Sequence, residues 1–260
     1  YKYWKEFPDL NIYVEPISHD GGTSMGGAYH VYYNDYVKMG KETKQIEPPK
    51  TIYYGPQYDP DTYLDYIHEY PSAKVTDASY DSVARLIREG NIVTIFQGRS
   101  EAGPRALGNR SILFDPRVKD GKDIVNRVKK REYFRPFAGT VLLEHARDWF
   151  DMDRLEESPF MMYAVDVLPE KRDLIPSIVH VDGTCRIQTV SQEQNENYYN
   201  LINEFYKLSG VPLLFNTSFN LGGQPLVETI FDAIHTLKSS QLEYLYLPEL
   251  GKLIKLSNEK

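Results

Sequence analysis

Hydrophobic and polar positions alternate along most of the chain in the order typical of α/β proteins. Short apolar runs predict strands, and stretches with apolar residues every three or four positions predict helices. The predicted strands are Thr51–Tyr54, Ile92–Phe96, Ser111–Phe114, Ala138–Leu143, Phe160–Val167, Arg186–Val190, Leu213–Asn216, and a terminal pair around Leu242–Leu247 and Lys252–Leu256. The predicted helices are Asp61–Glu69, Asp77–Arg88, Asp120–Lys130, Asn197–Leu208 and Thr229–Lys238. The alternation predicts an α/β domain over residues 50–260.

The first 45 residues follow a different pattern. The sequence predicts a short strand, a polar glycine turn and a helix, in that order, at Asn11–Pro16, His19–Ser24 and Met25–Val37. Residues 38–49 are polar, lack periodicity and end in two prolines, as a linker would. We therefore expect two units, 1–45 and 50–260, and we expect the first to be the remnant of a larger domain.

Composition narrows the class of protein. The 260 residues are 41% hydrophobic, enough to bury a core, and the single cysteine, Cys185, excludes an intrachain disulfide framework. Cys185 lies in a predicted strand with apolar neighbours, so we interpret it as a packing residue. No apolar run approaches the roughly 20 residues of a spanning helix, and we expect a cytoplasmic protein without a membrane partner.

The charge is distributed unevenly. The chain carries a net charge of −7, but residues 99–135 hold eleven Lys or Arg and five Asp or Glu. A basic segment in an acidic protein favours a pocket for a small polyanion and makes a nucleic-acid partner unlikely.

Three segments carry candidate chemistry, and each adjoins a predicted strand. Residues 97–111 combine three glycines with Arg99, Arg105 and Arg110, whose planar guanidinium groups suit phosphate or carboxylate oxygens. Ordinary surface arginines around turns are the alternative. Residues 215–225 follow a strand with short hydrogen-bonding side chains, either for a nucleotide or for the turn's own backbone. These side chains are Asn216, Ser218 and Asn220.

The third segment, residues 126–138, ends a predicted helix with consecutive cations. Lys129, Lys130 and Arg131 could bind an anion or could simply stabilise the helix carboxyl end. Arg135 lies among aromatic residues and proline, where we expect it to be partly buried and to need an anionic partner.

A further stretch, residues 177–189, predicts a hairpin turn at Asp182-Gly183 followed by a strand. Arg186 and Gln188 would then share one face of that strand. We interpret His180 as a turn residue, with a role in acid–base chemistry as the alternative.

Together these segments resemble the O-carbamoyltransferases of the nodulation (NodU), cephalosporin and tobramycin type. The matching blocks are GRSEAGPRALGNRSILFDPR at 98–117, KKREYFRPFAGTVL at 129–142, SPFM at 158–161, HVDGTCRIQTV at 180–190 and GVPLLFNTSFNLGGQPLV at 210–227. The resemblance covers roughly residues 85–250 and implies the family's C-terminal, YrdC-like domain: a twisted mixed sheet with flanking helices and a basic concave face. Gln224 and Cys185 depart from the family pattern, which often has Glu and Ala there.

The resemblance implies activation of carbamoyl phosphate by ATP, with Mg²⁺, to carbamoyl adenylate, whose carbamoyl group passes to a hydroxyl of an acceptor. It implies catalytic roles for Arg105, Arg135 and Lys130. It implies binding of substrate or nucleotide by Arg99, Arg110, Arg131, Arg186, Asn216, Ser218 and Asn220.

Residues 11–37 are similar to the end of the family's actin/hexokinase-like half, where Asp20 matches a ligand of Fe²⁺. The His-x-x-x-His pair that supplies other ligands is absent from this chain, so we expect iron only together with that N-terminal half. Two alternatives stay open: a non-catalytic nucleotide- or RNA-binding module, and threonylcarbamoyl adenylate synthesis. The RNA alternative is disfavoured by the pI of about 5.5.

Overall fold

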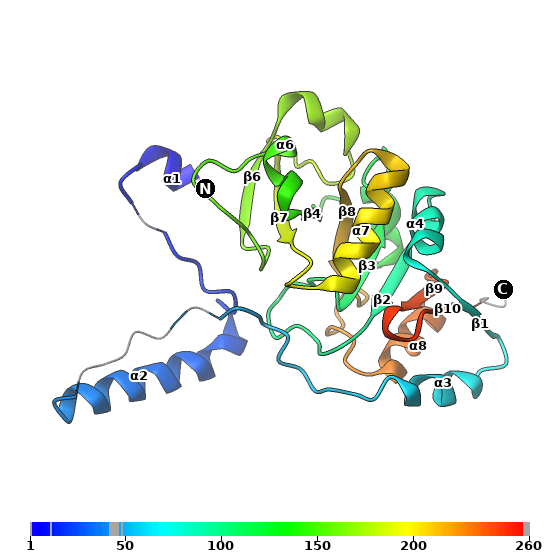
Figure 1. Cartoon of the computed structure of the whole chain (residues 1–260), viewed down its shortest axis with the longest axis horizontal. Coiled ribbons are helices and arrows are strands. Elements are labelled where there is room, and N and C mark those ends of the chain that lie inside the picture. The colour runs from blue at the N-terminus through cyan, green and yellow to red at the C-terminus, as the bar shows by residue number, and fades with distance from the viewer. Residues whose placement is uncertain (1, 11, 42–46, 48, 257–260) are drawn as a thin grey trace.

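A single mixed sheet organises the molecule. The computed structural model describes residues 2–10, 12–41, 47 and 49–256, and in this part of the chain ten strands form the sheet, in the order β1-β10-β9-β2-β3-β8-β4-β7-β6-β5 (Figure 1). The strands are β1 (Ala73–Asp77), β2 (Val93–Phe96), β3 (Arg110–Phe114), β4 (Ala138–Leu142), β5 (Phe150–Asp151), β6 (Tyr163–Val167), β7 (Thr184–Val190), β8 (Leu213–Ser218), β9 (Tyr244–Leu247) and β10 (Lys252–Leu256). The predicted α/β class with a mixed sheet is confirmed.

Helices cover both faces of this sheet. The helices of the described residues are α1 (Lys2–Glu6), α2 (Thr23–Lys38), α3 (Asp61–His68), α4 (Tyr80–Arg88), α5 (Gly121–Val128), α6 (Ala146–Trp149), α7 (Glu196–Ser209) and α8 (Ile230–Lys238). Apolar side chains of α4 and α7 join one buried cluster with the sheet, and those of α3 and α8 join a second. The sheet therefore has two apolar faces, which is why strands such as β2 and β3 are buried along their whole length.

Local capping explains where several helices begin. In α4 the Ser79 hydroxyl accepts a hydrogen bond from the Ser82 amide, and the Ser82 hydroxyl accepts one from the Ser79 amide. Thr229 and Asp232 form the same reciprocal arrangement at the start of α8. The helix predicted from Asp77 consequently begins three residues later.

The strand predicted at Thr51–Tyr54 is wrong. The segment lies outside the sheet, and its Ile52 carbonyl accepts a hydrogen bond from the Ala102 amide at 2.8 Å. The edge strand is instead β1, which pairs with β10. The side chains of Ile52 and Tyr53 thus pack with Leu107 of a loop, while Tyr54 is exposed.

The N-terminal residues lie beside the sheet domain. Helix α2 confirms the helix predicted at 25–37; it projects from the body in Figure 1, and none of its residues is buried. Residues 12–16 form no strand, and Asn11 and most of the predicted linker lie outside the described residues. Just before α2, Ile17 packs with Ile52, Leu107 and Ala138.

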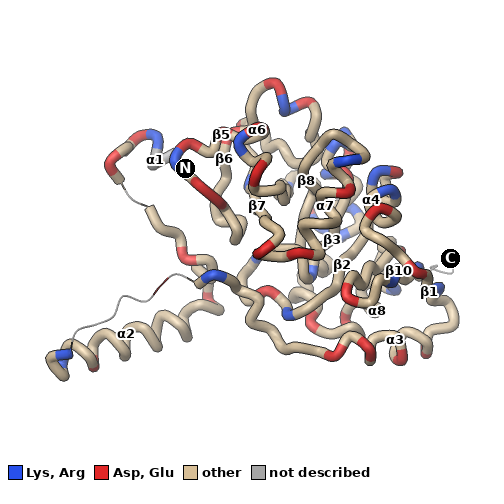
Figure 2. The backbone as a smooth tube through the Cα atoms, in the orientation of Figure 1, with Lys and Arg blue, Asp and Glu red and all other residues tan. Residues whose placement is uncertain are grey.

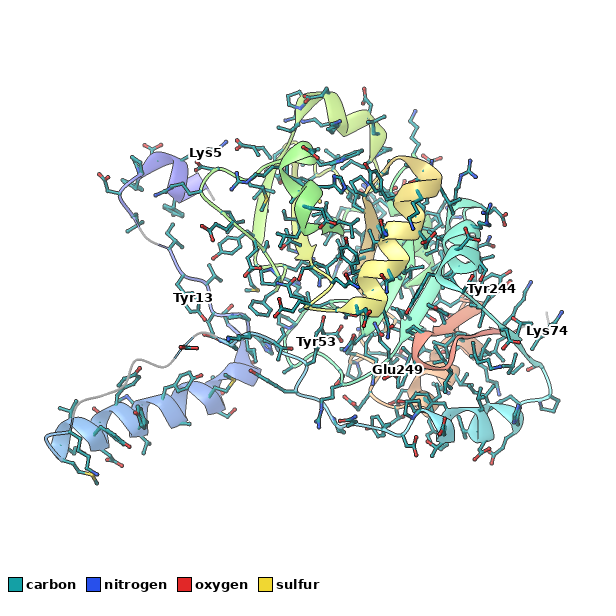
Figure 3. The ribbon with its side chains drawn as sticks, in the orientation of Figure 1. Lys5, Tyr13, Tyr53, Lys74, Tyr244 and Glu249 are labelled. Carbon is teal, nitrogen blue, oxygen red and sulfur yellow. The ribbon has the colours of Figure 1, made fainter. Side chains whose placement is uncertain are left out.

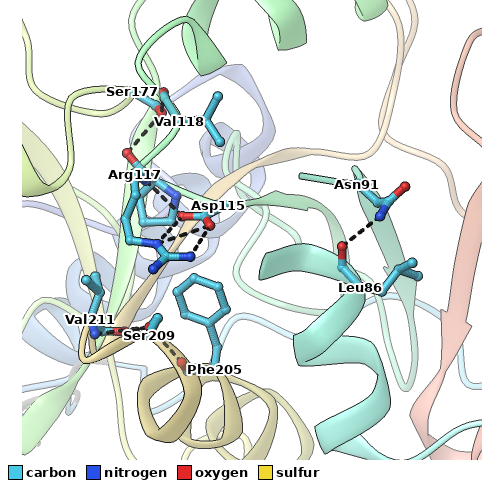
Figure 4. Close-up of polar contacts among 10 residues, drawn as sticks. Leu86, Asn91, Asp115, Arg117, Val118, Ser177, Phe205, Ser209 and Val211 are labelled. Atoms are coloured by element: carbon cyan, nitrogen blue, oxygen red, sulfur yellow. Dashed lines mark hydrogen bonds and ion pairs between the residues drawn. The ribbon is translucent and has the colours of Figure 1, made fainter. Parts of the chain in front are cut away.

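Polar contacts close the turn that follows β3 (Figure 4). The Arg117 guanidinium forms an ion pair with the buried Asp115 carboxylate at 2.6 Å. The Ser177 hydroxyl donates to the carbonyl of Pro116 or Val118, at 3.0 and 2.6 Å. The charges of Asp115 and Arg117 thus neutralise each other within this turn.

None of the helices in the described part of the chain has both the length and the apolar character that crossing a bilayer requires.

Candidate anion-binding site

The segments singled out in the sequence meet at one end of the sheet. Strand register places Phe96 opposite Arg110, and Ala138 opposite both Asn216 and Arg186. Three loops therefore leave the sheet at this same end, with residues 97–109, 129–137 and 219–229. The sequence prediction that these blocks form one site agrees with this topology.

Loop 97–109 is held by a carboxylate from within itself. One oxygen of Glu101, Oε1, accepts hydrogen bonds from the amides of Leu107, Asn109 and Arg110, at 2.7, 2.9 and 3.3 Å. Burial raises the pKa of Glu101, although these hydrogen bonds oppose the shift. The sequence analysis did not include Glu101, because residues 97–111 were selected for their glycines and arginines.

Residues outside the loop also fix it. The Tyr53 hydroxyl donates to the Leu107 carbonyl at 2.9 Å, and the Gly98 amide donates to Glu249 at 3.0 Å; Figure 3 labels both side chains. Gly108 has a φ of +108°, and a Cβ there would lie 2.2 Å from the Tyr198 ring, so only glycine fits. The loop is thus rigid at both of its ends.

Arg110 is part of this framework. Its side chain is fully buried, its guanidinium lies 3.6 Å from the centre of the Phe96 ring, and it donates to carbonyls at 2.5–3.2 Å. These carbonyls belong to Gln97, Gly98, Asn109 and Glu228. The two terminal nitrogens of Arg110 are thus bonded to backbone carbonyls, and its Nε is buried without a hydrogen bond. A phosphate-binding role for Arg110 would require the terminal nitrogens to change partner.

Three other arginines lack such partners. Arg105, Arg131 and Arg186 are partly buried, and within the described residues none has a carboxylate at ion-pair distance. Burial, then the charges of Arg105 and Arg131, lowers the pKa of Arg186 to about 10. The Nε atoms of Arg105 and Arg186 are buried without a hydrogen bond. Arg105 and Arg131 are thus close enough to affect the pKa of Arg186. Like charges held together in a partly dry site are an arrangement that favours a bound anion.

Arg131 is oriented by its neighbours. Its Nε donates to the Asn126 side chain at 2.7 Å, and its guanidinium lies 4.1 Å from the centre of the Phe137 ring. Burial lowers the pKa of Arg131 to about 10, with the charge of Arg135 adding to the effect. Its remaining donors are therefore available in a fixed direction.

Lys129, which the sequence analysis named as a possible anion ligand but did not assign to the site, lies against Ser218 and Asn220. Lys129 is 2% exposed, and its Nζ contacts the Ser218 carbonyl at 2.5 Å and Asn220 Oδ1 at 2.9 Å. Burial, then the charge of Arg131, lowers its pKa well below the usual value. When a buried lysine is bonded only to neutral oxygens, a bound anion strongly stabilises its charged, ammonium form.

Lys130 points elsewhere. It has a φ of +53°, and its exposed side chain donates to the Ser239 carbonyl at 2.9 Å, at the end of α8. The left-handed residue reverses the chain after α5, so two adjacent lysines face opposite sides. Lys129 therefore lies with Ser218 and Asn220, whereas Lys130 lies against the end of α8, and the catalytic role predicted for Lys130 stays a prediction.

The residues of the 215–225 block occupy the expected place. Ser218 Oγ donates to Asn220 Oδ1 at 2.7 Å, beside Lys129. Asn216 Nδ2 contacts the Ala106 carbonyl and the Thr140 hydroxyl, at 3.0 and 2.9 Å, while its Oδ1 is buried without a partner. Asn216 therefore ties β8 to loop 97–109.

Two predicted cations lie at the margin. Arg135 is exposed and pairs with Glu132 at 2.7 Å, so the prediction that it is partly buried is wrong; Phe134 beside it is 66% exposed and does not cover it. Arg99 is also exposed, and its guanidinium donates to the Gly55 carbonyl at 2.8 Å. Both would need to change partner to bind a ligand.

The remaining candidates do not join the cluster. Cys185 is fully buried, and burial raises the pKa of its thiol to about 12, in line with the packing role expected for it. His180 bridges the Phe137 carbonyl and the Thr184 hydroxyl, at 2.9 and 3.1 Å, in a turn. That turn leads into β7, which pairs with β4 and β6, so residues 177–183 form no hairpin arm.

Asp20 does not fit an iron site by itself. It is exposed in a short turn, and no cluster of three or more His, Cys, Asp or Glu residues suited to a metal occurs in the described part of the chain. The donor set present here therefore cannot hold Fe²⁺.

Comparison with known proteins connects this geometry to a family. The family described as "Carbamoyltransferase C-terminus" matches residues 84–252, which include all three loops and β2 to β9. The chain belongs to this family. The family resemblance inferred from the motifs is confirmed.

Relatives of this carbamoyltransferase C-terminal domain include nodulation proteins. The chain is 41% identical to nodulation protein NolNO of Sinorhizobium fredii over 90% of its length, and 39% identical to NolO of Bradyrhizobium diazoefficiens over 90%. It is 34% identical to nodulation protein U of Rhizobium tropici over 82%. The chain spans 35%, 43% and 34% of these three proteins.

Solved structures with similar backbones are more distant from this carbamoyltransferase domain. Full-length HypF in its phosphate- and nucleotide-bound form has a TM-score of 0.45 at 18% identity, over 65% of this chain and 21% of HypF. YciO of E. coli has a TM-score of 0.42 at 12% identity, over 66% of this chain and 80% of YciO.

Proposed function

We propose that this domain carries out the ATP-dependent activation step of carbamoyl transfer. Hydrolysis of carbamoyl phosphate would release inorganic phosphate and leave carbamate, whose oxygen would attack the α-phosphorus of ATP to give carbamoyl adenylate and pyrophosphate. The carbamoyl group would then pass to a hydroxyl of a small-molecule or glycan acceptor, with release of AMP. Membership of the carbamoyltransferase family supports transfer of a carbamoyl group. The adenylate step and the acceptor are the proposal.

One observation carries the proposal: at one end of the sheet, four partly or fully buried cations have no ion-pair partner among the described residues. Arg105, Arg131, Arg186 and Lys129 are partly or fully buried, and burial lowers the pKa of each. A protein maintains such repulsion at a cost in stability, and a bound polyanion removes it. Phosphate-rich reactants need fixed positive charge to offset their own and to align in-line attack on phosphorus.

The division of labour follows from distance and exposure. We assign Arg105, Arg131, Arg186 and Lys129 to phosphate and carbamoyl oxygens. Ser218 and Asn220, which already contact Lys129, can exchange their mutual hydrogen bond for one to the nucleotide or the intermediate. Arg99 and Arg135 lie at the exposed margin and would bind only after leaving Gly55 and Glu132.

The charge distribution favours a small ligand. Figure 2 shows Lys and Arg interspersed with Asp and Glu along most of the chain, including acidic positions on α3. A long nucleic acid needs an extended track of cations, whereas carbamoyl phosphate and a triphosphate need only the local cluster. Mg²⁺ would enter with ATP, bound mainly by phosphate oxygens and water.

The acceptor belongs to a larger assembly in this proposal. The curated relatives are more than twice as long as the chain they match. We propose that an N-terminal region such as theirs is the partner of this domain, that it binds the acceptor, and that residues 16–17, which pack on loop 97–109, connect the two regions.

The test is pyrophosphate release from ATP by this chain, with and without carbamoyl phosphate. Release only when both substrates are present supports the proposal. Binding of both, measured as ligand-dependent stabilisation, without turnover would assign binding to this domain and chemistry to the larger assembly. Absence of both turnover and binding contradicts the proposed function.

A further inference from the structure

Glu101 is a buried carboxylate inside a basic loop, and the proposed reaction gives it no role. It is 5% exposed, and its Oε1 is occupied by three backbone amides. A proton acceptor in catalysis must reach its substrate, and this carboxylate is enclosed by its own loop. Its contacts indicate an organising role.

The loop that Glu101 closes contains Arg105. The bonded amides belong to Leu107, Asn109 and Arg110, so the carboxylate links residue 101 to residues 107–110. Arg105 lies in the segment between these linked positions. The carbonyl of the next residue, Ala106, is fixed by Asn216 at 3.0 Å. The position of the Arg105 backbone is therefore set from both sides.

Glu101 and Arg110 divide the polar groups of the loop between them. The carboxylate accepts from amide groups, while the guanidinium of Arg110 donates to the carbonyls of Gln97, Gly98 and Asn109. Their opposite charges also attract, since each shifts the pKa of the other toward the ionised form. A loop of thirteen residues without regular structure would otherwise have many conformations, and ordering it is costly in entropy.

We propose that Glu101 is the positioning residue for Arg105: it fixes loop 97–109 so that the Arg105 guanidinium is presented to the bound anion. This inference rests on the proposed function for its ligand, carbamoyl phosphate. Its structural half, the closure of the loop, stands on the contacts of Glu101 alone. A charge-assisted bond from one carboxylate to several amides is the kind of support that preorganised sites require.

A double-mutant cycle with carbamoyl phosphate tests the proposal. Glu101→Gln keeps the size of the side chain and removes its charge, and we expect it to weaken carbamoyl phosphate binding about tenfold. Arg105→Met alone should weaken binding at least as much. Because Glu101 acts through Arg105, the double variant should bind no more weakly than Arg105→Met alone. Multiplied losses would overturn the proposal.

Amide hydrogen exchange gives a readout that does not depend on the ligand. In Glu101→Gln the amides of Leu107, Asn109 and Arg110 should exchange about tenfold faster, while amides of α7 keep their protection. Unchanged exchange at these three positions overturns the proposal. Ser177→Ala is the matched control, because Ser177 is also buried and bonded to the backbone, but at residues 116–118. It should leave carbamoyl phosphate affinity unchanged.

The two failures are distinguishable. If the wild-type chain binds no carbamoyl phosphate, the proposed function fails, and hydrogen exchange decides the role of Glu101 by itself. If the wild type binds and Glu101→Gln binds equally well, the positioning role fails while the proposed function stands.

Discussion

Arginines at the two ends of β3 have opposite electrostatic environments. Beyond its last residue, Arg117 pairs with Asp115, and the hydrogen bond with Asp115 raises the pKa of Arg117. At its first residue the sheet end holds Arg105 and Arg186, whose pKa values are lowered by burial. At the first end the charge of Arg117 is neutralised by Asp115. At the other end only a bound anion would neutralise the charges of Arg105 and Arg186. The same residue type thus serves structure or binding according to its partners.

Arg110 lies at the binding end but belongs to the structural class, so Arg110→Met should have the largest effect on stability. Four carbonyls would each lose a hydrogen bond in a buried site, although that of Asn109 would keep the Gln97 amide as a donor. We expect the free energy of unfolding to fall by about 3 kcal/mol or more. Urea denaturation measures this. Arg105→Met, the control, should leave the free energy of unfolding unchanged or raise it. Equal losses in the two variants would erase the distinction.

Lys129 and Lys130 are adjacent, but only Lys129 lies in the proposed binding site, so substitutions of the two should differ in their effect on activity. Lys129→Met should lower kcat/KM for the adenylate-forming reaction about 100-fold, or about 2.7 kcal/mol in transition-state stabilisation. Lys130→Met should change it less than about twofold, because Lys130 bonds the Ser239 carbonyl outside the cluster. The reverse ranking would return the catalytic role to Lys130.

The pH dependence of Lys129 follows from its lowered pKa. Between that pKa and the usual value of 10.5, the unfolded chain binds more protons than the folded protein. The free energy of unfolding should therefore rise with pH in this window, and Lys129→Met should remove that rise. Affinity for carbamoyl phosphate should fall over the same window, since binding needs the charged ammonium. Urea midpoints measured from pH 7 to 10 check the sign.

Asp115→Asn removes the ion pair between Asp115 and Arg117 at the end of the sheet away from the proposed site. It should lower the free energy of unfolding by about 1–2 kcal/mol, since the Asp115 carboxylate is buried and Arg117 is one-third exposed. Carbamoyl phosphate affinity should stay within about twofold of wild type. A tenfold loss of affinity would show that the two ends are coupled.

Cys185 gives the smallest expected effect. A buried thiol with a pKa of about 12 is almost fully protonated at neutral pH. A thiol reagent at pH 8 should label the denatured protein and leave the folded protein unlabelled over the same period. Cys185→Ala should leave kcat/KM within about twofold of wild type. Rapid labelling of the folded protein would contradict the packing role.

Sequence reasoning predicted which blocks meet, because strands that precede or follow polar glycine-rich segments place those segments at strand ends. It favoured Lys130 over Lys129, because the directions of the two side chains depend on one left-handed residue after α5 that the sequence does not reveal. It placed Arg135 in a buried setting because of its aromatic neighbours, but Phe134 is exposed. It included Arg110 because composition does not reveal which carbonyls a guanidinium meets.

The N-terminal residues show the same limit. The pattern at 51–54 has the apolar character of a strand, but a strand also needs a free edge to pair with. In the fold β10 pairs with β1, and Ile52 packs on the site loop instead. Long-range pairing of this kind is not encoded in a local window of sequence.

Isothermal titration of carbamoyl phosphate into the wild-type chain and into Arg105→Met and Arg186→Met tests the central claim most directly. If these cations are held unpaired for an anion, the wild type binds and each variant binds at least about tenfold more weakly, while its urea midpoint equals or exceeds that of the wild type. Equal affinity in all three proteins, or loss of stability in both variants without loss of affinity, would show that the cluster is structural and contradict the account.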